Sequence, residues 1–222
     1  MKVGIIDSGI GGKGIEKEIK KLLPEIKTIY LADSKNFPYG TKKVSELNQI
    51  LANNVNILIE KNVDLIVLAC NSGSVSSLEY LRKNFELPII GVVPAIKMAS
   101  EKTKTKNIAL FSTPVTSKSK IVAGLIKDYC KGIKVYKIYF KYLAEQVEEG
   151  KIKEAQENIQ TKWQDYKTKN IDTIILGCTH YVLIKDEIQK IVGPKIKLVD
   201  SNLAVARRVK SLYNKIYSKE RL

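Results

Sequence analysis

Two cysteines stand at equivalent points of two closely similar apolar stretches. The stretch "NVDLIVLACN" at 62–71 carries Cys70, and "NIDTIILGCT" at 170–179 carries Cys178. Each stretch is typical of a buried strand, and each cysteine follows the last apolar residues of that strand. A thiolate in such a place can act as a nucleophile or as a base. Two thiols placed alike suit a reaction that removes a proton from one face of a carbon and returns a proton to the other face.

Polar residues that could assist these thiols lie close by in the sequence. The only histidine of the chain, His180, stands two residues after Cys178, and Asp7 follows another apolar run near the N-terminus. A histidine or an aspartate can exchange protons with a thiol or tune its acidity. Asp7 could instead cap the helix that follows it. Short polar side chains at the expected helix starts are suited to holding a carboxylate: Asn71, Ser72 and Thr179.

The elements that must position these residues form an alternating pattern. Short runs rich in Ile and Val alternate with longer amphipathic segments, which predicts an α/β fold with parallel strands covered on both faces. The predicted strands are Val3–Ile6, Thr28–Leu31, Leu65–Ala69, Ile89–Val93, Ile108–Phe111, Val135–Ile138, Thr173–Gly177 and Ile196–Val199. The predicted helices are Val44–Lys61, Ser74–Asn84, Thr116–Tyr129, Glu149–Lys167 and Leu183–Ile191.

The strands repeat as a set, in one order and at a nearly constant offset of about 107 residues along the chain. This repeat predicts two similar half-domains, residues 1–94 and 95–201, with a C-terminal helix at about 202–222 packed back on the first. Ligands of open parallel sheets bind beyond the carboxyl ends of the strands, where both cysteines fall. A pseudo-two-fold packing of the halves would place the cysteines on opposite sides of one cleft.

Composition and charge limit the classes of function. The chain has 44% hydrophobic and 27% charged residues, as ordinary globular proteins do, and no apolar run that could cross a bilayer. The start of the chain is too weakly apolar for a secretory signal, so a cytoplasmic protein without a membrane partner is expected. The net charge of +15 could favour nucleic acids. Because the lysines are spread along the chain, however, nucleic acid is not expected as a partner.

The cysteine and histidine content argues against several kinds of site. Three cysteines and one histidine predict neither a disulfide framework nor a metal site, and Cys130 has no matching context. The glycine-rich stretch "DSGIGGKG" at 7–14 lacks the ending of a phosphate-binding P-loop. No lysine stands in a setting typical of a pyridoxal Schiff base. No cofactor is therefore expected.

Six motifs in order carry a family resemblance. They are "GIIDSGIGG" (4–12), "PYGTK" (38–42), "ACNS" (69–72), "GVVPAIK" (91–97), "LGCTHYVLI" (176–184) and "VDSNLAVARRV" (199–209). Together they resemble the signatures of the glutamate racemases, within the cofactor-independent aspartate/glutamate racemase superfamily. The match runs from residue 3 to about 209. Val182 follows Tyr181 where the family usually has proline, and Ser72 stands where it usually has threonine.

The resemblance implies two facing α/β domains and a two-base racemisation that interconverts L- and D-glutamate and supplies D-glutamate for peptidoglycan synthesis. It implies that Cys70 and Cys178 are the bases, with Asp7 and His180 as their auxiliaries. Glu145 lies near a family acidic residue, and its role stays open. The substrate site that the resemblance implies consists of Asp7, Ser8, Tyr39, Gly40, Asn71, Ser72, Thr113, Thr116, Thr179 and His180.

Several alternatives remain open at this level. Another member of the superfamily would act on aspartate, a hydantoin or a related acid through the same carboxylate-binding residues. A non-catalytic basic binding protein could use the same scaffold. Cysteine-dependent acyl transfer or amidase chemistry is disfavoured, because Cys70 has no separate base next to it in the sequence. The expected partners are a small-molecule substrate, glutamate, and a second copy of the chain in a homodimer.

Overall fold

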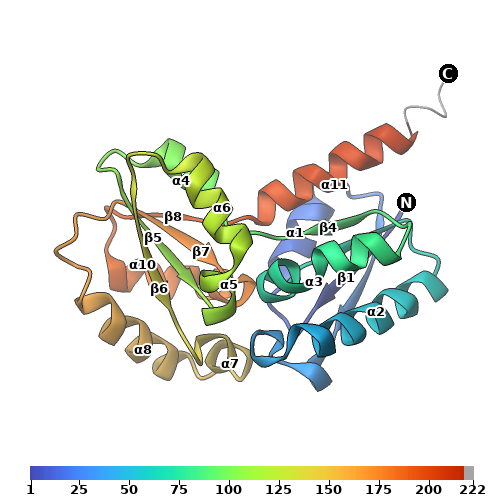
Figure 1. The fold of residues 1–222 in the computed structure, drawn as a ribbon, viewed down its shortest axis with the longest axis horizontal. Helices are drawn as coiled ribbons and strands as arrows, with labels where there is room; N and C mark the ends of the chain where they lie inside the picture. Colours follow the sequence, from blue (N-terminus) through green and yellow to red (C-terminus); the bar gives the residue numbers. More distant parts are fainter. Residues whose placement is uncertain (218–222) are drawn as a thin grey trace. The chain divides into compact units, whose positions relative to one another are not determined.

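Two parallel sheets form the framework of the protein (Figure 1). The computed structural model describes residues 1–217, and within them each sheet has four strands. The chain divides into two compact units, Met1–Val92 with the segment from Ser201 onward, and Val93–Asp200. Residues 218–222, the end of the predicted C-terminal helix, lie outside the described residues. The predicted α/β class with two similar parallel sheets is confirmed.

The strands of the two sheets follow the same order. The first sheet has the order β2-β1-β3-β4, with bounds β1 Lys2–Asp7, β2 Lys27–Ala32, β3 Leu65–Leu68 and β4 Ile89–Gly91. The second has the order β6-β5-β7-β8, with bounds β5 Asn107–Ser112, β6 Lys134–Tyr139, β7 Thr173–Gly177 and β8 Lys197–Val199. All the strand pairings are parallel, so the carboxyl ends of the strands in a sheet lie at one edge.

Helices connect the strands, as parallel pairing requires. In the first unit these are α1 Lys13–Leu22, α2 Val44–Glu60, α3 Asn71–Asn84 and α11 Asn202–Tyr217, with short 3₁₀ turns η1 Ser34–Asn36 and η2 Tyr39–Thr41. In the second unit they are α4 Ile96–Lys102, α5 Pro114–Lys118, α6 Lys120–Tyr129, α7 Leu143–Glu148, α8 Ile152–Gln164, α9 Thr179–Leu183 and α10 Lys185–Val192. None of the helices described in residues 1–217 is long and apolar enough to span a membrane.

Alternating strand residues build two core layers in the first unit. Val3 and Ile5 of β1 point to one face and pack with α1 and α11, whereas Ile6 points to the other face and packs with α2. All four residues of β3 are fully buried, which explains why its sequence is continuously apolar. Each such side chain contributes roughly 1.5–3 kcal/mol of hydrophobic stabilisation. This packing fixes the strand ends on which the candidate site stands.

The second unit buries its sheet in a similar way but with more aromatic residues. Ile108 and Leu110 of β5 pack on one face with α4 and α6. Phe111, the next residue along β5, has its ring 5.2 Å from Phe140 and 5.9 Å from Trp163 of α8, both edge to face. Edge-to-face pairs at these distances add to the stability from burial alone. Helix α8 is thereby held against the sheet.

The single helix predicted at Thr116–Tyr129 is wrong, because the chain breaks it at Ser119. Helix α5 ends at Lys118 and α6 begins at Lys120. The side chain of Ser119 accepts a hydrogen bond from the N–H of Val122 at 3.2 Å and so caps α6. A serine that satisfies a helix-start N–H competes with continuation of the previous helix.

Two further helix predictions differ from the structure only in their bounds. The helix predicted at Glu149–Lys167 begins only after Gly150, whose φ of +70° is a left-handed conformation that ends α7. The helix predicted at Leu183–Ile191 is α10, which begins two residues later and ends one residue later; Ile184, with φ −111° and ψ +31°, separates it from the short preceding helix α9. These breaks create the short helices that carry the polar residues of the second unit.

Candidate active site

Cys70 stands at the start of a long helix in the first unit. It follows β3 after Ala69 and is the N-cap of α3. Its Sγ accepts a hydrogen bond from the backbone N–H of Gly73 at 3.5 Å, and the residue is 8% exposed. An N–H donor and the positive end of a helix favour the thiolate form of a cysteine. Cys70 is therefore placed to serve as a base.

Asp7 and Ser8 lie beside this cysteine because β1 and β3 are neighbours. Ala69 N–H donates to the carbonyl of Ile6 at 2.7 Å, so the two strands end side by side. Ser8 Oγ lies 3.9 Å from Cys70 Sγ. The carboxyl end of β1 thus delivers both predicted residues to the cysteine.

The interpretation of Asp7 as a helix cap is not supported. Helix α1 begins at Lys13, its N-cap is Gly12, and no side chain caps it. The fully buried Asp7 instead accepts a hydrogen bond at Oδ1 from the N–H of Gly9, at 2.8 Å. The carboxylate therefore accepts a hydrogen bond from the loop that follows β1.

A buried hydrogen-bond network fixes Tyr39 in the same unit. Its hydroxyl donates to Asp33 Oδ2 at 2.8 Å, and Asn54 Nδ2 donates to that oxygen at 2.8 Å and to the Tyr39 oxygen at 3.0 Å. Burial and the Asp33 carboxylate raise the pKa of Tyr39 far above its ordinary value, and the charges of Cys70 and Asp7 add to this. The tyrosine therefore remains a hydrogen-bond donor.

The first turn of α3 packs closely against this tyrosine. Asn71 and Ser72 are buried at 3% and 4% exposure. A Cβ atom on Gly73 would lie 3.3 Å from Tyr39 Cδ2, so glycine allows the ring to approach the helix start. Gly40 is half-buried in the 3₁₀ turn η2. We call the following group the first half-site: Asp7, Ser8, Tyr39, Gly40, Cys70, Asn71 and Ser72.

Cys178 holds the corresponding place in the second unit. It follows β7 directly, precedes α9 and is 7% exposed. Among the described residues no N–H caps its sulfur, unlike that of Cys70. Ser112 of β5 pairs with Gly177 of β7, so Thr113 leaves the sheet beside Cys178. The neighbouring Thr179 is buried.

His180 forms a close pair with an acid that the sequence interpretation missed. Its Nε2 lies 2.6 Å from Glu148 Oε2, and both groups are largely buried. If Glu148 is ionised, Nε2 donates this hydrogen bond, and Nδ1 is then the lone-pair nitrogen of the neutral ring. Such a pairing fixes the tautomer and orientation of the histidine. The predicted auxiliary of Cys178 is therefore itself held by a carboxylate.

Glu145 stands one helical turn before Glu148 on α7. Burial raises the pKa of its carboxyl above the ordinary value, while the neighbouring charge of His180 opposes this shift. The i, i+3 spacing of the two glutamates places them on one face of the helix, a signal that could have paired them in the sequence. Both acids thus lie close to His180, and Glu148 makes the direct hydrogen bond.

Thr113 and Thr116 are hydrogen-bonded to one another. Thr113 Oγ1 accepts from the N–H of Thr116 at 3.3 Å and donates to Thr116 Oγ1 at 3.1 Å. This geometry caps the start of α5. We call the following group the second half-site: Thr113, Thr116, Glu145, Glu148, Cys178, Thr179 and His180.

Tyr181 is a further polar residue of the second unit that the sequence interpretation did not assign. It is fully buried, and its ring lies 5.9 Å from Phe140, edge to face. Within the described part of the chain its hydroxyl has no hydrogen-bond partner. Burial, with the charges of Cys178 and Glu145, raises the pKa of Tyr181 well above its ordinary value.

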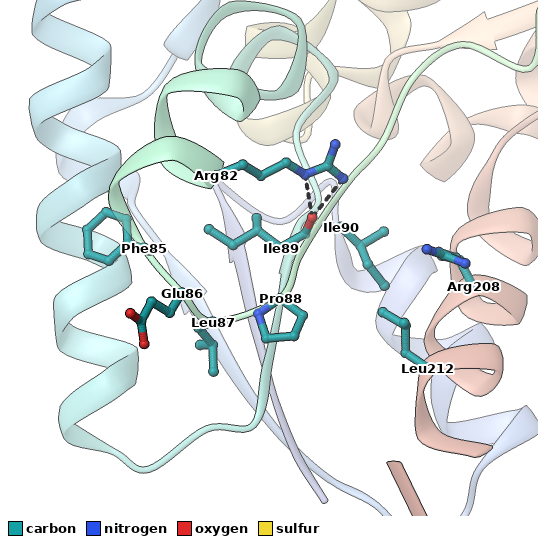
Figure 2. Close-up of a pocket in the computed structure, with 9 residues that line it drawn as sticks. All are labelled: Arg82, Phe85, Glu86, Leu87, Pro88, Ile89, Ile90, Arg208 and Leu212. Carbon is teal, nitrogen blue, oxygen red and sulfur yellow. Dashed lines mark hydrogen bonds between the residues drawn. The ribbon is translucent and has the colours of Figure 1, made fainter. Parts of the chain in front are cut away.

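Two cavities lie away from the predicted site residues. One, of about 420 Å³, lies in the first unit beside β4 and α11 (Figure 2). There Arg82 donates from Nε and Nη2 to the carbonyl of Ile89, at 2.9 and 2.8 Å, and Arg208 lines the wall. The other, of about 370 Å³, lies in the second unit and is lined by Trp163 and Asp172 among others. Neither is lined by a residue of the half-sites.

A family model described as "Asp/Glu/Hydantoin racemase" matches residues 13–209. The chain belongs to this family. The resemblance read from the motifs is confirmed, and the chain is a racemase, which is a kind of isomerase.

Individual relatives agree with the family. A glutamate racemase of Clostridium botulinum (strain Alaska E43 / Type E3) is 35% identical over 211 residues, which cover 94% of this chain and 82% of the relative. Escherichia coli glutamate racemase, solved with L-glutamate and the activator UDP-MurNAc-Ala, has a TM-score of 0.88 at 32% identity, covering 95% of this chain and 81% of that one. The Francisella tularensis glutamate racemase, solved with D-glutamate, has a TM-score of 0.82 at 30% identity, covering 96% and 81%.

Proposed function

We propose that the chain is a glutamate racemase that interconverts L- and D-glutamate by a two-base reaction, without a bound cofactor. The observation that carries this proposal is the equivalent placement of Cys70 and Cys178, which follow β3 and β7, the third strands across two sheets of the same strand order. The similarity to glutamate racemases, some of them solved with L- or D-glutamate, supports glutamate as the substrate.

The reaction needs one thiolate and one thiol on opposite faces of the substrate α carbon. The thiolate takes the α proton from one face, and the electron pair of the broken C–H bond stays on carbon. The thiol then gives its proton to the other face of that carbon, which inverts the centre and leaves a thiolate there. Each cysteine thus ends in the protonation state that the other began with. The proposal requires the two half-sites to hold one substrate molecule between the two sulfurs.

The first half-site supplies a base and a place for a carboxylate. Cys70 receives the N–H of Gly73, which stabilises its thiolate form. Asn71 and Ser72 begin α3, where N–H groups and short polar side chains suit the substrate's α-carboxylate. Holding that carboxylate stabilises the carbanion, since negative charge spreads onto it during proton removal. Asp7 and Ser8 assist Cys70, and Tyr39 and Gly40 line the substrate site next to the first turn of α3.

The second half-site supplies the other base with a different set of helpers. His180 is held by Glu148 and is placed two residues from Cys178 to exchange protons with it or with the substrate. Glu145, with its raised pKa, adds a second acid close to His180. Thr113, Thr116 and Thr179 contribute hydroxyl groups for substrate binding. We assign Glu148 the role of positioning His180.

The same proposal extends to the use of the product, the location of the enzyme and its oligomeric state. D-glutamate made in this way would supply peptidoglycan synthesis. We propose a cytoplasmic location, as the small and odd number of cysteines in the sequence leads us to expect. We also propose a homodimer, since α2 exposes the large apolar side chains of Val44, Ile57 and Ile59. Light scattering of the purified protein tests the dimer independently of activity.

The function is tested with purified protein, L-glutamate and, in parallel, L-aspartate, without added pyridoxal phosphate. Circular dichroism of the substrate follows inversion. We expect the signal of L-glutamate to decay to zero as the racemate forms, while that of L-aspartate stays unchanged. Faster inversion of L-aspartate would make the chain a different racemase of the family. No inversion of either acid would contradict the proposed activity.

A further inference from the structure

A surface of alternating tyrosines and lysines follows the edge strand β6 of the second sheet. Strand β6 stands at the end of the order β6-β5-β7-β8, with β5 as its neighbour (Figure 1). Residues 131–144 around it contain four lysines and three tyrosines but no Asp or Glu. Along the whole sequence the lysines look evenly spread, yet here the fold gathers them beside exposed aromatic rings.

The rings and the ammonium groups of this surface are paired in space. Lys134 Nζ lies 5.1 Å from the ring centroid of Tyr136, and Lys162 of α8 lies 5.0 Å from that of Tyr139. Lys141 Nζ lies 4.9 Å from the ring centroid of Tyr142. These distances are within the range of cation–π attraction. We call these six residues the tyrosine–lysine surface: Lys134, Tyr136, Tyr139, Lys141, Tyr142 and Lys162.

The same rings remain accessible to a ligand. Tyr139 is 43% exposed and Tyr142 is 55% exposed. Tyr136 is half-buried, and its ring packs edge to face against that of Tyr166, with centroids 6.0 Å apart. A fixed ring with an open side can stack with a flat group, and a lysine beside it can pair with an anion.

We propose that the tyrosine–lysine surface binds single-stranded nucleic acid without sequence preference. Proteins of that kind combine cations that follow the phosphate backbone with aromatic side chains on which bases stack. Because side chains alternate along a strand, Tyr136 and Tyr139 leave β6 on opposite faces, so the pairs of Lys and Tyr side chains lie along both sides of the exposed sheet edge. A second copy of the chain fits poorly, because pairing two such edges would bring lysines against lysines. This binding is independent of the racemase reaction, whose residues lie in the two half-sites.

The test uses fluorescence anisotropy of a labelled oligothymidylate of about 20 nucleotides with the full-length protein. We expect Tyr139→Ala to weaken binding about five- to hundredfold, the range for loss of one base–aromatic stack. Tyr80→Ala is the matched control, because Tyr80 is an exposed tyrosine of the first unit, at 37% exposure. Retained racemase activity in both variants shows that they are folded.

Charge is tested separately with a pair of double variants. Lys134→Gln/Lys162→Gln should weaken binding and reduce the slope of log K against log salt by roughly 1.4, at about 0.7 per phosphate contact on a single strand. Lys17→Gln/Lys21→Gln removes the same charge from exposed lysines of α1 and should leave the slope nearly unchanged.

Any one of four results would overturn the proposal. Equal losses in both double variants would mean general attraction by the net charge. Tighter binding of duplex DNA, or full competition by polyglutamate with no effect of Tyr139→Ala, would point to another kind of polyanion. If the oligonucleotide does not bind, the lysines serve only to prevent the edge strand β6 from pairing with a strand of another chain.

Discussion

The two units use one sheet order but obtain their acidic groups from different places. In the first unit Asp7 is the last residue of β1 and lies at the strand edge with Cys70. The equivalent last residue of β5 in the second unit is Ser112, which is not acidic. There the acids come from α7, and Glu148 reaches His180 at 2.6 Å. The cysteine positions are thus shared, whereas their helpers differ.

This difference indicates which parts of a duplicated fold are fixed by its topology. A strand end has one position in a parallel sheet, so a residue placed there is kept in register by the strand pairing. Helpers on loops and short helices are free to change, since they depend only on local packing. The helix starts show the same contrast. Cys70 caps a helix of 14 residues with an N–H bond to its sulfur, whereas Cys178 precedes one of five residues.

The largest effect is expected from loss of either cysteine. Cys70→Ala and Cys178→Ala should each lower kcat for glutamate racemisation by about 10²- to 10⁴-fold, the usual contribution of a general acid–base group. Circular dichroism of L- and D-glutamate measures both directions. Cys130→Ala is the matched control and should keep its activity, since Cys130 is buried at the end of α6. Wild-type turnover in either active-site variant would show that the half-sites are not equivalent.

The next largest effect is expected at the hydrogen-bonded pair of His180 and Glu148 in the second unit. Glu148→Gln keeps an oxygen acceptor for His180 but removes the charge, and we expect kcat to fall about ten- to hundredfold. Rescue is expected from Glu148→Asp if the carboxylate can still reach the ring. Glu149→Gln, at an exposed glutamate that pairs with Lys151, is the control and should change kcat little. Equal effects of Glu148→Gln and Glu149→Gln would rule out a specific positioning role.

Two buried tyrosines offer a matched comparison of stability. Tyr39→Phe removes a donor from buried Asp33 and should destabilise the first unit by about 1–3 kcal/mol. Tyr181→Phe removes a hydroxyl without a partner in the described residues, so we expect no loss of stability in the second unit. Urea unfolding is followed by far-UV circular dichroism, and by the fluorescence of Trp163 for the second unit. A larger loss for Tyr181→Phe would show that its hydroxyl has a partner.

The smallest effect depends on pH through Glu16 of α1. Burial alone would raise its pKa, but hydrogen bonds from Lys20, Lys13 and Thr28 outweigh it and lower the pKa to about 2 from 4.5. A lowered pKa gives stability that is present above pH 4.5 and is lost as the pH falls through 2. Glu16→Gln should therefore be less stable than wild type by about 1–2 kcal/mol at pH 7, after allowance for screening, and equally stable near pH 2.

The control for this pH dependence is Glu79→Gln. Glu79 also pairs with a lysine four residues later, Lys83, but both side chains are exposed. We expect no measurable change in stability at any pH, because exposed ion pairs contribute little. A pH-dependent loss equal to that of Glu16→Gln would show that the effect is general to helix ion pairs and not specific to the buried carboxylate.

Much of the framework could be predicted from sequence because buried strands leave a strong signal. The predicted strand Thr173–Gly177 has the same bounds as β7. The repeat of Ile/Val runs along the chain predicted the second sheet. The cysteines stood out because each follows such a run. A strand end is local information, carried by consecutive residues.

The partner of His180 could not be predicted in this way. The helical spacing places Glu145 on one face with both Glu148 and Glu149, so the sequence does not show which of these glutamates reaches His180. The choice of Glu148 depends on how α7 packs against α9, which is a contact between segments more than 30 residues apart. The break at Ser119 was missed for a related reason, since one side-chain hydrogen bond decided between one helix and two.

The most direct test of the two-base proposal follows deuterium during the first few per cent of turnover in deuterated water. Mass spectrometry of the separated enantiomers is carried out starting from L-glutamate and then from D-glutamate. Because one cysteine removes the proton and the other, already exchanged with solvent, delivers a deuteron, the product should carry deuterium at the α carbon while the remaining substrate stays protiated. Equal deuterium in substrate and product from the start would contradict the assignment of Cys70 and Cys178 as two separate bases.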